Sequence, residues 1–193
     1  MAHIILFGPP GCGKGTQAKK LTAITKYNFV CMALGDLLRK QISENAVHKA
    51  TIEQYIRKGQ LVPDSLSFEV VEDFIQKQAA GVSFLFDGFP RNIPQAIFLD
   101  NLLAQYKTQI EAAIFLEVEK KYLLERLQSR AVKEGRLDDQ DLHTIQTRME
   151  LYEQETLPIA NYYERMNKLY KVDGMRASDQ VTETIEGIIN GLK

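Results

Sequence analysis

The chain carries, close to its start, the glycine-rich stretch Gly8-Pro9-Pro10-Gly11-Cys12-Gly13-Lys14-Gly15-Thr16. An apolar run at 4–7 precedes it, and a stretch typical of a helix follows from residue 14. A glycine-rich loop between a strand and a helix lets successive backbone N–H groups face phosphate oxygens, and the helix N-terminus adds partial positive charge. Lys14 supplies a mobile cation and Thr16 a hydroxyl for a metal-bound phosphate. The pattern predicts a phosphate-binding loop, with Gly15 directly after the lysine and the hydroxyl one place later.

Short apolar runs recur along the chain between longer amphipathic stretches. The strand candidates are 4–7, 29–31, 84–86, 114–118 and 169–172, and the helix candidates are about 14–25, 36–43, 49–58, 65–80, 95–105, 120–132, 139–167 and 179–190. The strand candidates are continuously apolar, so we expect both of their faces to be covered. The alternation predicts an α/β fold with a doubly wound, parallel, five-stranded sheet, whose ligands bind beyond the carboxyl ends of the strands.

The composition narrows the classes of protein. With 24 Lys and Arg against 25 Asp and Glu in 193 residues, the chain lacks the basic excess of a general nucleic-acid binder. Its two cysteines, Cys12 and Cys31, suggest neither a metal cluster nor a disulfide framework. There is no signal-peptide pattern and no apolar run near the roughly 20 residues that span a bilayer. We therefore expect a soluble cytoplasmic protein of one domain, 1–193, without nucleic-acid or membrane partners.

A second phosphate site is indicated by Leu34-Gly35-Asp36-Leu37-Leu38-Arg39. Gly35 and Asp36 form a natural helix start, and Arg39 falls one turn inside, toward the helix N-terminus. The alternative is an arginine on a solvated helix face.

The third strand candidate leads into Asp87-Gly88-Phe89-Pro90-Arg91. An acidic residue at the end of a buried strand is typical of a Mg²⁺ site, bound directly or through water. Gly88 permits close backbone approach, and Pro90 gives Arg91 a rigid turn. The alternative for Asp87 is a turn-forming role alone.

Four arginines follow late in the chain: Arg126, Arg130, Arg136 and Arg148. Arg126 and Arg130 share a helix face. Phosphoryl transfer leaves charge on the equatorial oxygens of the moving group, so several cations placed around it stabilise the transition state. Arginines on a mobile loop would also exclude water. Taken singly, each of them also suits an exposed surface.

These segments, together with Arg136-Leu137-Asp138-Asp139, resemble the signature segments of the adenylate kinase family in order and spacing, over nearly the whole chain. The resemblance implies a P-loop kinase fold with a small monophosphate-binding lobe at 33–62 and a short lid at 130–140, without the ligands of a zinc-binding lid. It implies a monomeric transferase of nucleotide biosynthesis that moves a phosphoryl group reversibly from MgATP to AMP, giving two ADP.

The resemblance also implies roles for individual residues. ATP would be bound by Gly11, Cys12, Gly13, Lys14, Gly15, Thr16, Arg126, Arg130 and Arg176. AMP would be bound by Leu34, Arg39, Gln60, Leu61, Val62, Gly88, Phe89, Pro90, Arg91, Gln95, Arg136 and Arg148. The catalytic residues would be Lys14, Arg91, Arg130, Arg136 and Arg148. Asp87 would act on Mg²⁺ through water.

Two alternatives remain at this stage. Uridine/cytidine monophosphate kinase shares the loop and the short lid. The adenylate kinase family usually has threonine at the position of Leu34, and the alternative typically has alanine, whereas the amide of Gln95 favours a purine. A GTP-driven switch needs Asn-Lys-x-Asp, but the chain has Asn167-Lys168-Leu169-Tyr170. A purely structural nucleotide-binding module would leave the arginines without a role.

Overall fold

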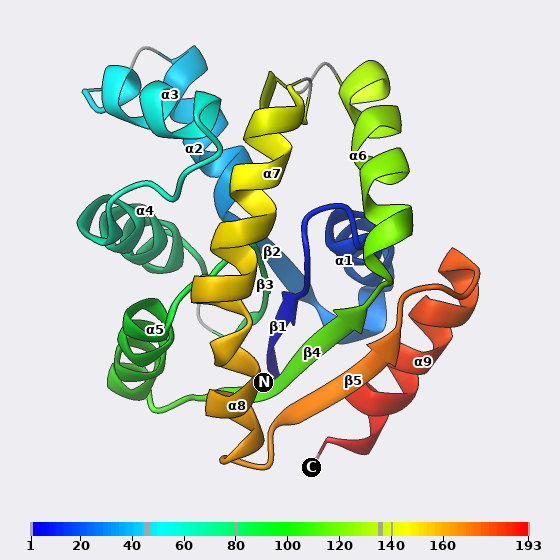
Figure 1. Ribbon diagram of the computed structural model, residues 1–193. Coiled ribbons are helices and arrows are strands. Elements are labelled where there is room, and N and C mark those ends of the chain that lie inside the picture. The colour runs from blue at the N-terminus through cyan, green and yellow to red at the C-terminus, as the bar shows by residue number, and fades with distance from the viewer. Residues whose placement is uncertain (1, 45–46, 80, 135–136, 140, 193) are drawn as a thin grey trace.

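The computed structural model describes residues 2–44, 47–79, 81–134, 137–139 and 141–192. Figure 1 shows one central sheet between two groups of helices. Its strands are β1 His3–Phe7, β2 Phe29–Ala33, β3 Ser83–Asp87, β4 Ile110–Glu117 and β5 Leu169–Asp173. They pair in parallel in the order β2-β3-β1-β4-β5. The prediction of an α/β protein with a parallel, five-stranded sheet is confirmed.

The helices follow the expected alternation with the strands. They are α1 Lys14–Ala23, α2 Leu34–Ser43, α3 Lys49–Arg57, α4 Asp64–Gln76, α5 Ile93–Gln105, α6 Lys120–Glu134, α7 Leu142–Leu151, α8 Pro158–Glu164 and α9 Ser178–Gly191. Shorter helical segments lie at Thr25–Tyr27, Leu137–Asp139 and Tyr152–Thr156.

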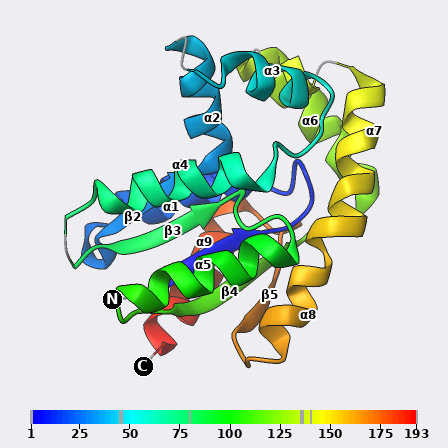
Figure 2. The ribbon, with the colours of Figure 1, turned by 90° about the vertical axis from the view of Figure 1, so that its left-hand side faces the viewer.

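The first strand shows why the apolar runs are continuous. Ile5 and Phe7 pack into the core formed with α2, α3, α4, α5 and α8, whereas Ile4 and Leu6 pack into the core formed with α1 and α9. Successive side chains of a strand point to opposite faces, so a strand covered on both sides needs apolar residues at every position. Figure 2 shows α4 and α5 lying along one face of the sheet.

Among the boundaries that differ from the sequence prediction, two have a clear structural reason. β4 begins at Ile110, four positions before the predicted start at 114, because Ile110 and Ala112 are buried even though Glu111 lies between them. The prediction of a single α-helix over 139–167 is wrong. This segment instead comprises α7, a π-helical segment at Tyr152–Thr156 and α8. Pro158 has no N–H to donate, and the preceding N–H of Leu157 reaches back five residues to the Tyr152 carbonyl at 2.8 Å.

The strand order places a topological switch at β1, which lies between β3 and β4. The chain therefore leaves β1 for one side of the sheet and later passes to the other, which opens a crevice at the carboxyl ends of the strands. Figures 1 and 2 show α2, α3, α6 and α7 extending beyond that edge. In the described part of the chain, no helix has both the length and the apolarity that a membrane span needs.

Candidate functional site

The glycine-rich loop lies at the switch point, between β1 and α1. Gly11 and Gly13 have φ values of 82° and 102°, in the left-handed region that glycine adopts without a steric penalty. Lys14 folds back over the loop, and its Nζ donates to the carbonyl oxygens of Gly8 at 2.8 Å and Pro9 at 3.1 Å. The ammonium group thus already lies over the loop, on a flexible stem that can reach a phosphate.

A cavity of about 800 Å³ extends from this loop along the carboxyl ends of the strands. This is toward the upper end of the range for small-molecule sites. Of the residues proposed for the site, the following line it: Gly11, Cys12, Gly13, Lys14, Gly15, Thr16, Leu34, Arg39, Gln60, Leu61, Val62, Asp87, Gly88, Pro90, Arg91, Gln95, Arg126, Arg130, Arg148 and Arg176. The fold therefore brings residues from 11 to 176 to one cavity.

Two predicted residues are not placed there. Phe89 is fully buried and packs in the core on the α4 and α5 side of the sheet, so its side chain does not line the cavity. Arg136 lies outside the described residues, as does part of the stretch 130–140.

Arg39 returns over the N-terminus of its own helix, as its position predicted. Its guanidinium group pairs with Asp36, and its Nη2 would lie 3.2 Å from a Cβ at Gly35. Glycine at position 35 therefore leaves room for the guanidinium group beside the first turn of α2. The combination of a cation and unpaired N–H groups at a helix start suits an anion.

Arg91 is held by its backbone and its side chain. Its N–H donates to Gln95 Oε1 at 2.7 Å, and its carbonyl accepts from the Thr156 hydroxyl at 2.7 Å. Its Nε donates to the Gly88 carbonyl at 2.9 Å. Burial and the nearby guanidinium group of Arg148 lower the pKa of Arg91 to about 10. The site thus concentrates positive charge in a poorly solvated place, which favours a bound anion.

Asp139 joins two further arginines of the cavity. Its side chain is fully buried, and its carboxylate accepts from Arg130 Nε at 2.6 Å and Nη2 at 2.9 Å and also pairs with Arg148. Burial raises the pKa of Asp139, but the two guanidinium groups outweigh it and hold the pKa below its ordinary value. Asp138 adds a contact of 2.9 Å to Arg148. Both aspartates belong to the motif at 136–139, but no role was predicted for either of them.

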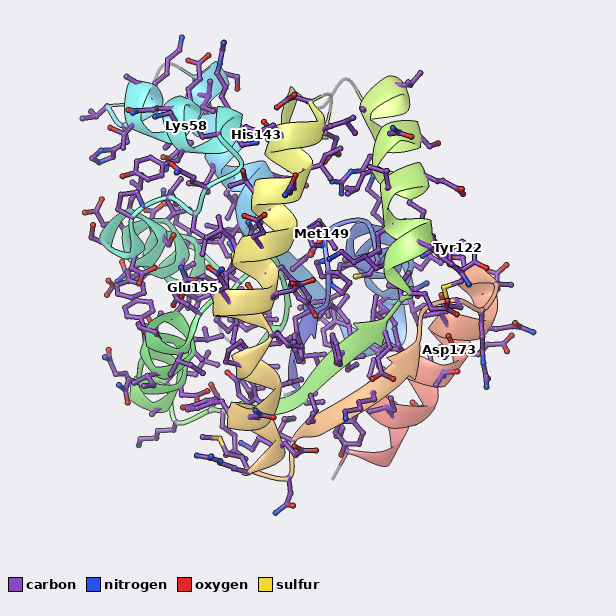
Figure 3. All side chains as sticks on the ribbon, in the orientation of Figure 1. Lys58, Tyr122, His143, Met149, Glu155 and Asp173 are labelled. Carbon is purple, nitrogen blue, oxygen red and sulfur yellow. The ribbon has the colours of Figure 1, made fainter. Side chains whose placement is uncertain are left out.

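The other end of the cavity lies beside β5 and α9. Arg126 on α6 donates from both terminal nitrogens to the Gly174 carbonyl, each at 3.3 Å. Arg176 lies in the same loop and contacts Asp173 at 3.5 Å. Figure 3 labels Asp173 at the end of β5, next to the start of α6 that Tyr122 marks. The guanidinium groups of Arg126 and Arg176 therefore both lie at this loop.

The amide of Gln95 is oriented by neighbours that the sequence did not reveal. Its Nε2 donates to Asp64 Oδ1 at 2.7 Å, and Asp64 also accepts from Asn92 Nδ2 at 3.1 Å. Asn92 in turn caps α5 by accepting from the Gln95 N–H at 2.9 Å. Gln95 is 1 % exposed, so this network fixes which amide atom faces which way. The only early signal for Asp64 was its place after Pro63, at a predicted helix start.

A junction between α3 and α7 closes the side of the cavity that Gln60, Leu61 and Val62 line. The Thr144 hydroxyl donates to the Arg57 carbonyl at 3.3 Å. A Cβ at Gly59, which has a φ of 68°, would meet the Thr144 carbonyl oxygen at 2.7 Å. Figure 3 shows Lys58 and His143 together at this junction. The stretch 59–62 therefore depends on a close backbone approach to α7.

Asp87 lies at the carboxyl edge of the sheet, close to the glycine-rich loop. It ends β3 beside β1, and its Oδ2 would lie 3.6 Å from a Cβ at Gly15. The carboxylate therefore faces the start of α1, where Thr16 also lines the cavity. Among the described residues no group of three or more His, Cys, Asp or Glu could hold a metal by itself. One carboxylate and one hydroxyl fit Mg²⁺, which is commonly bound by few protein ligands together with substrate phosphates and water.

Comparison with known proteins agrees with this geometry. The family model described as adenylate kinase matches residues 6–168. A protein named adenylate kinase from Flavobacterium psychrophilum is 37 % identical over 192 residues, covering all of both chains. Its namesake from Flavobacterium johnsoniae is 36 % identical over 192 residues with the same coverage. One from Clostridium perfringens is 34 % identical over 216 aligned positions, covering 98 % of this chain and 99 % of its own.

Proposed function

Because this chain belongs to the adenylate kinase family, it is a phosphotransferase that phosphorylates AMP, and we propose that the cavity at the carboxyl edge of its sheet binds ATP and AMP on opposite sides of the glycine-rich loop. The observation that carries this arrangement is the continuity of the cavity from Arg176 past Lys14 to Leu34. Two nucleotides that meet end to end at their phosphates need such a shape.

ATP occupies the side of α6 and α9. Its phosphates lie in the loop from Gly11 to Thr16, where backbone N–H groups and the start of α1 face them. Its base lies against Arg126 and the loop that holds Gly174. The guanidinium plane of Arg126, held by two hydrogen bonds, presents a face on which a base can stack.

AMP occupies the side of α2, α4 and α5. Arg39 and Arg91 bind its phosphate, because both guanidinium groups line the cavity. Burial and nearby positive charge already lower the pKa of Arg91, and a bound anion would stabilise its charged form. Leu34 and Val62, both buried cavity residues, pack on its base, with Gln60 and Leu61 at the edge. Gln95 presents an amide whose orientation is set by Asp64 and by the Arg91 N–H.

The chemistry then consists of placing and neutralising charge. Lys14 leaves its loop carbonyls and follows the transferred group, while Arg91, Arg130 and Arg148 surround its equatorial oxygens. Asp87 and Thr16 are the residues that would hold Mg²⁺, Asp87 through water, and the ion would neutralise phosphate charge. Residues 33–62 act as a monophosphate-binding lobe and 130–140 as a short lid that excludes water, both within one domain. Arg136 belongs to this lid. The monomeric state and the cytoplasmic location stay predictions.

The direct test measures diphosphate formation by the purified protein with MgATP and, in turn, AMP, CMP, UMP and GMP. We expect the highest kcat/KM with AMP. A preference for CMP or UMP would refute AMP as the acceptor in favour of a pyrimidine monophosphate.

Arg91→Ala tests the division of the cavity. The KM for AMP should rise by about two orders of magnitude, because a buried cation that binds a phosphate is removed, while the KM for ATP changes little. Arg57→Ala is the matched control, since Arg57 is an exposed arginine on α3 that pairs with Glu53. An equal rise in the KM for AMP and the KM for ATP would count against the assignment of Arg91 to the AMP phosphate.

A further inference from the structure

Ser67 on α4 has a hydroxyl that the fold buries but does not use. Ser67 is 1 % exposed, and its Oγ is one of three buried side-chain polar atoms in the described part of the chain that have no hydrogen-bond partner, with those of Gln41 and Tyr152. An unpaired buried hydroxyl costs free energy that alanine at the same position would not. A ligand that completes its hydrogen bonds would account for this cost.

The helix itself does not provide a partner for this hydroxyl. A serine within a helix commonly bonds to the carbonyl four residues earlier, as Thr22 and Thr182 do here at 2.9 Å with Ala18 and Ser178. For Ser67 that acceptor is the carbonyl of Pro63, which already accepts from the backbone N–H groups of Leu66 and Ser67, each at 3.1 Å. The Ser67 hydroxyl makes no hydrogen bond to this shared carbonyl.

The surroundings of Ser67 point to the ligand. Ser67 lines the cavity, and α4 packs between α2, which carries Leu34, and α5, which carries Gln95. Ser67 follows Asp64 by three residues, so both lie on the helix face that reaches Gln95. This end of the cavity carries the apolar side chains of Leu34 and Val62 together with the polar side chain of Gln60. The Gln95 amide and the Ser67 hydroxyl are the buried polar groups that α5 and α4 add to it.

We propose that Ser67 is a specificity-determining residue, whose hydroxyl forms a hydrogen bond to the purine edge of the acceptor monophosphate. This inference rests on the proposed placement of AMP at this end of the cavity. The side chain of Leu34 can pack on a base but has no polar atom, so the hydroxyl that discriminates between bases is supplied from α4. A hydroxyl can accept from an exocyclic amino group or donate to a ring nitrogen, and adenine offers both.

Ser67→Ala is the first test, with kcat, the KM of each nucleotide and the Kd of AMP from calorimetry. We expect the KM and Kd of AMP to rise about fivefold, the size of one neutral hydrogen bond, with kcat and the KM of ATP unchanged. The preference for AMP over GMP should fall by a similar factor. The melting temperature should stay the same or rise, because an unpaired buried hydroxyl is lost and alanine favours the helix.

Two variants make the result decisive. Ser67→Thr keeps a hydroxyl and should keep the wild-type KM of AMP and the preference for AMP over GMP. Ser65→Ala removes an exposed hydroxyl from the same helix and should leave every nucleotide constant unchanged. If the Kd of AMP is the same for Ser67→Ala and Ser65→Ala, or if Ser67→Ala raises the KM of ATP as much as that of AMP, the role of Ser67 is refuted. The proposed function stands in either case. If the wild-type protein fails to phosphorylate AMP, both are refuted.

Discussion

Asp139→Asn tests whether the buried carboxylate holds the arginines of the cavity. The substitution keeps the shape of the side chain and removes its charge, so the paired guanidinium groups of Arg130 and Arg148 lose their shared partner. Breaking a fully buried ion pair costs about 3–5 kcal/mol. Here the arginine side chains are 26 % and 14 % exposed, and Arg148 keeps Asp138 at 2.9 Å, so we expect about 2 kcal/mol. For a domain of this size that corresponds to a melting temperature lower by about 6 °C.

The measurement is thermal unfolding by circular dichroism, paired with kcat at 25 °C, where the variant is still folded. We expect kcat to fall about tenfold, because the two guanidinium groups are no longer held in place. The control is Asp73→Asn, which breaks the exposed pair with Lys77 at 2.7 Å and should change stability by less than about 0.5 kcal/mol. Equal melting temperatures for the two variants would refute the structural role assigned to Asp139.

Three other substitutions probe separate parts of the molecule. Lys14→Met should abolish turnover without changing the melting temperature, and near-normal rates would remove this lysine from the mechanism. Gly59→Ala should unfold at lower urea than Gly81→Ala, because both have positive φ but only the first Cβ meets a backbone carbonyl, at 2.7 Å; equal midpoints would contradict this. Burial lowers the pKa of His3 to about 4, so the unfolded chain takes up the proton first and stability falls by about 3 kcal/mol as pH drops from 6.5 to 4. Urea titrations across this pH range should show that the His3→Asn protein loses less stability than the wild type. An equal loss of stability in the two proteins would contradict the role of His3.

The sheet was predictable because its signal is local. A strand covered on both faces must be apolar at every position, and the runs 4–7 and 84–86 meet that condition. In the edge strand β5 only Val172 is buried. The start of β4 was missed because Glu111 interrupts its apolar run. The break between α7 and α8 was missed because the amphipathic pattern continues through the π-helical segment, whereas the hydrogen bonding changes before Pro158.

The candidate site was predictable to the extent that its motifs are contiguous. Lys14, Arg39 and Arg91 each lie within four residues of a glycine that makes room for them or shapes their loop. Sequence alone therefore suggested a role for each. Phe89 was included with its motif although it faces the core. Asp64 and Ser67 belong to no motif, and their contribution depends on what α2 and α5 place opposite them.

The amino-acid sequence by itself determined the phosphate-binding loop, because positive φ at Gly11 and Gly13, a following helix and one lysine are properties of neighbouring residues. It also determined the burial of β1 and β3 on both faces of the sheet. Tertiary structure alone decided the strand order, the convergence of Arg126 and Gly174 from 48 positions apart, and the unpaired hydroxyl of Ser67. These features depend on contacts between residues that are distant in the chain, and local sequence patterns carry no record of such contacts.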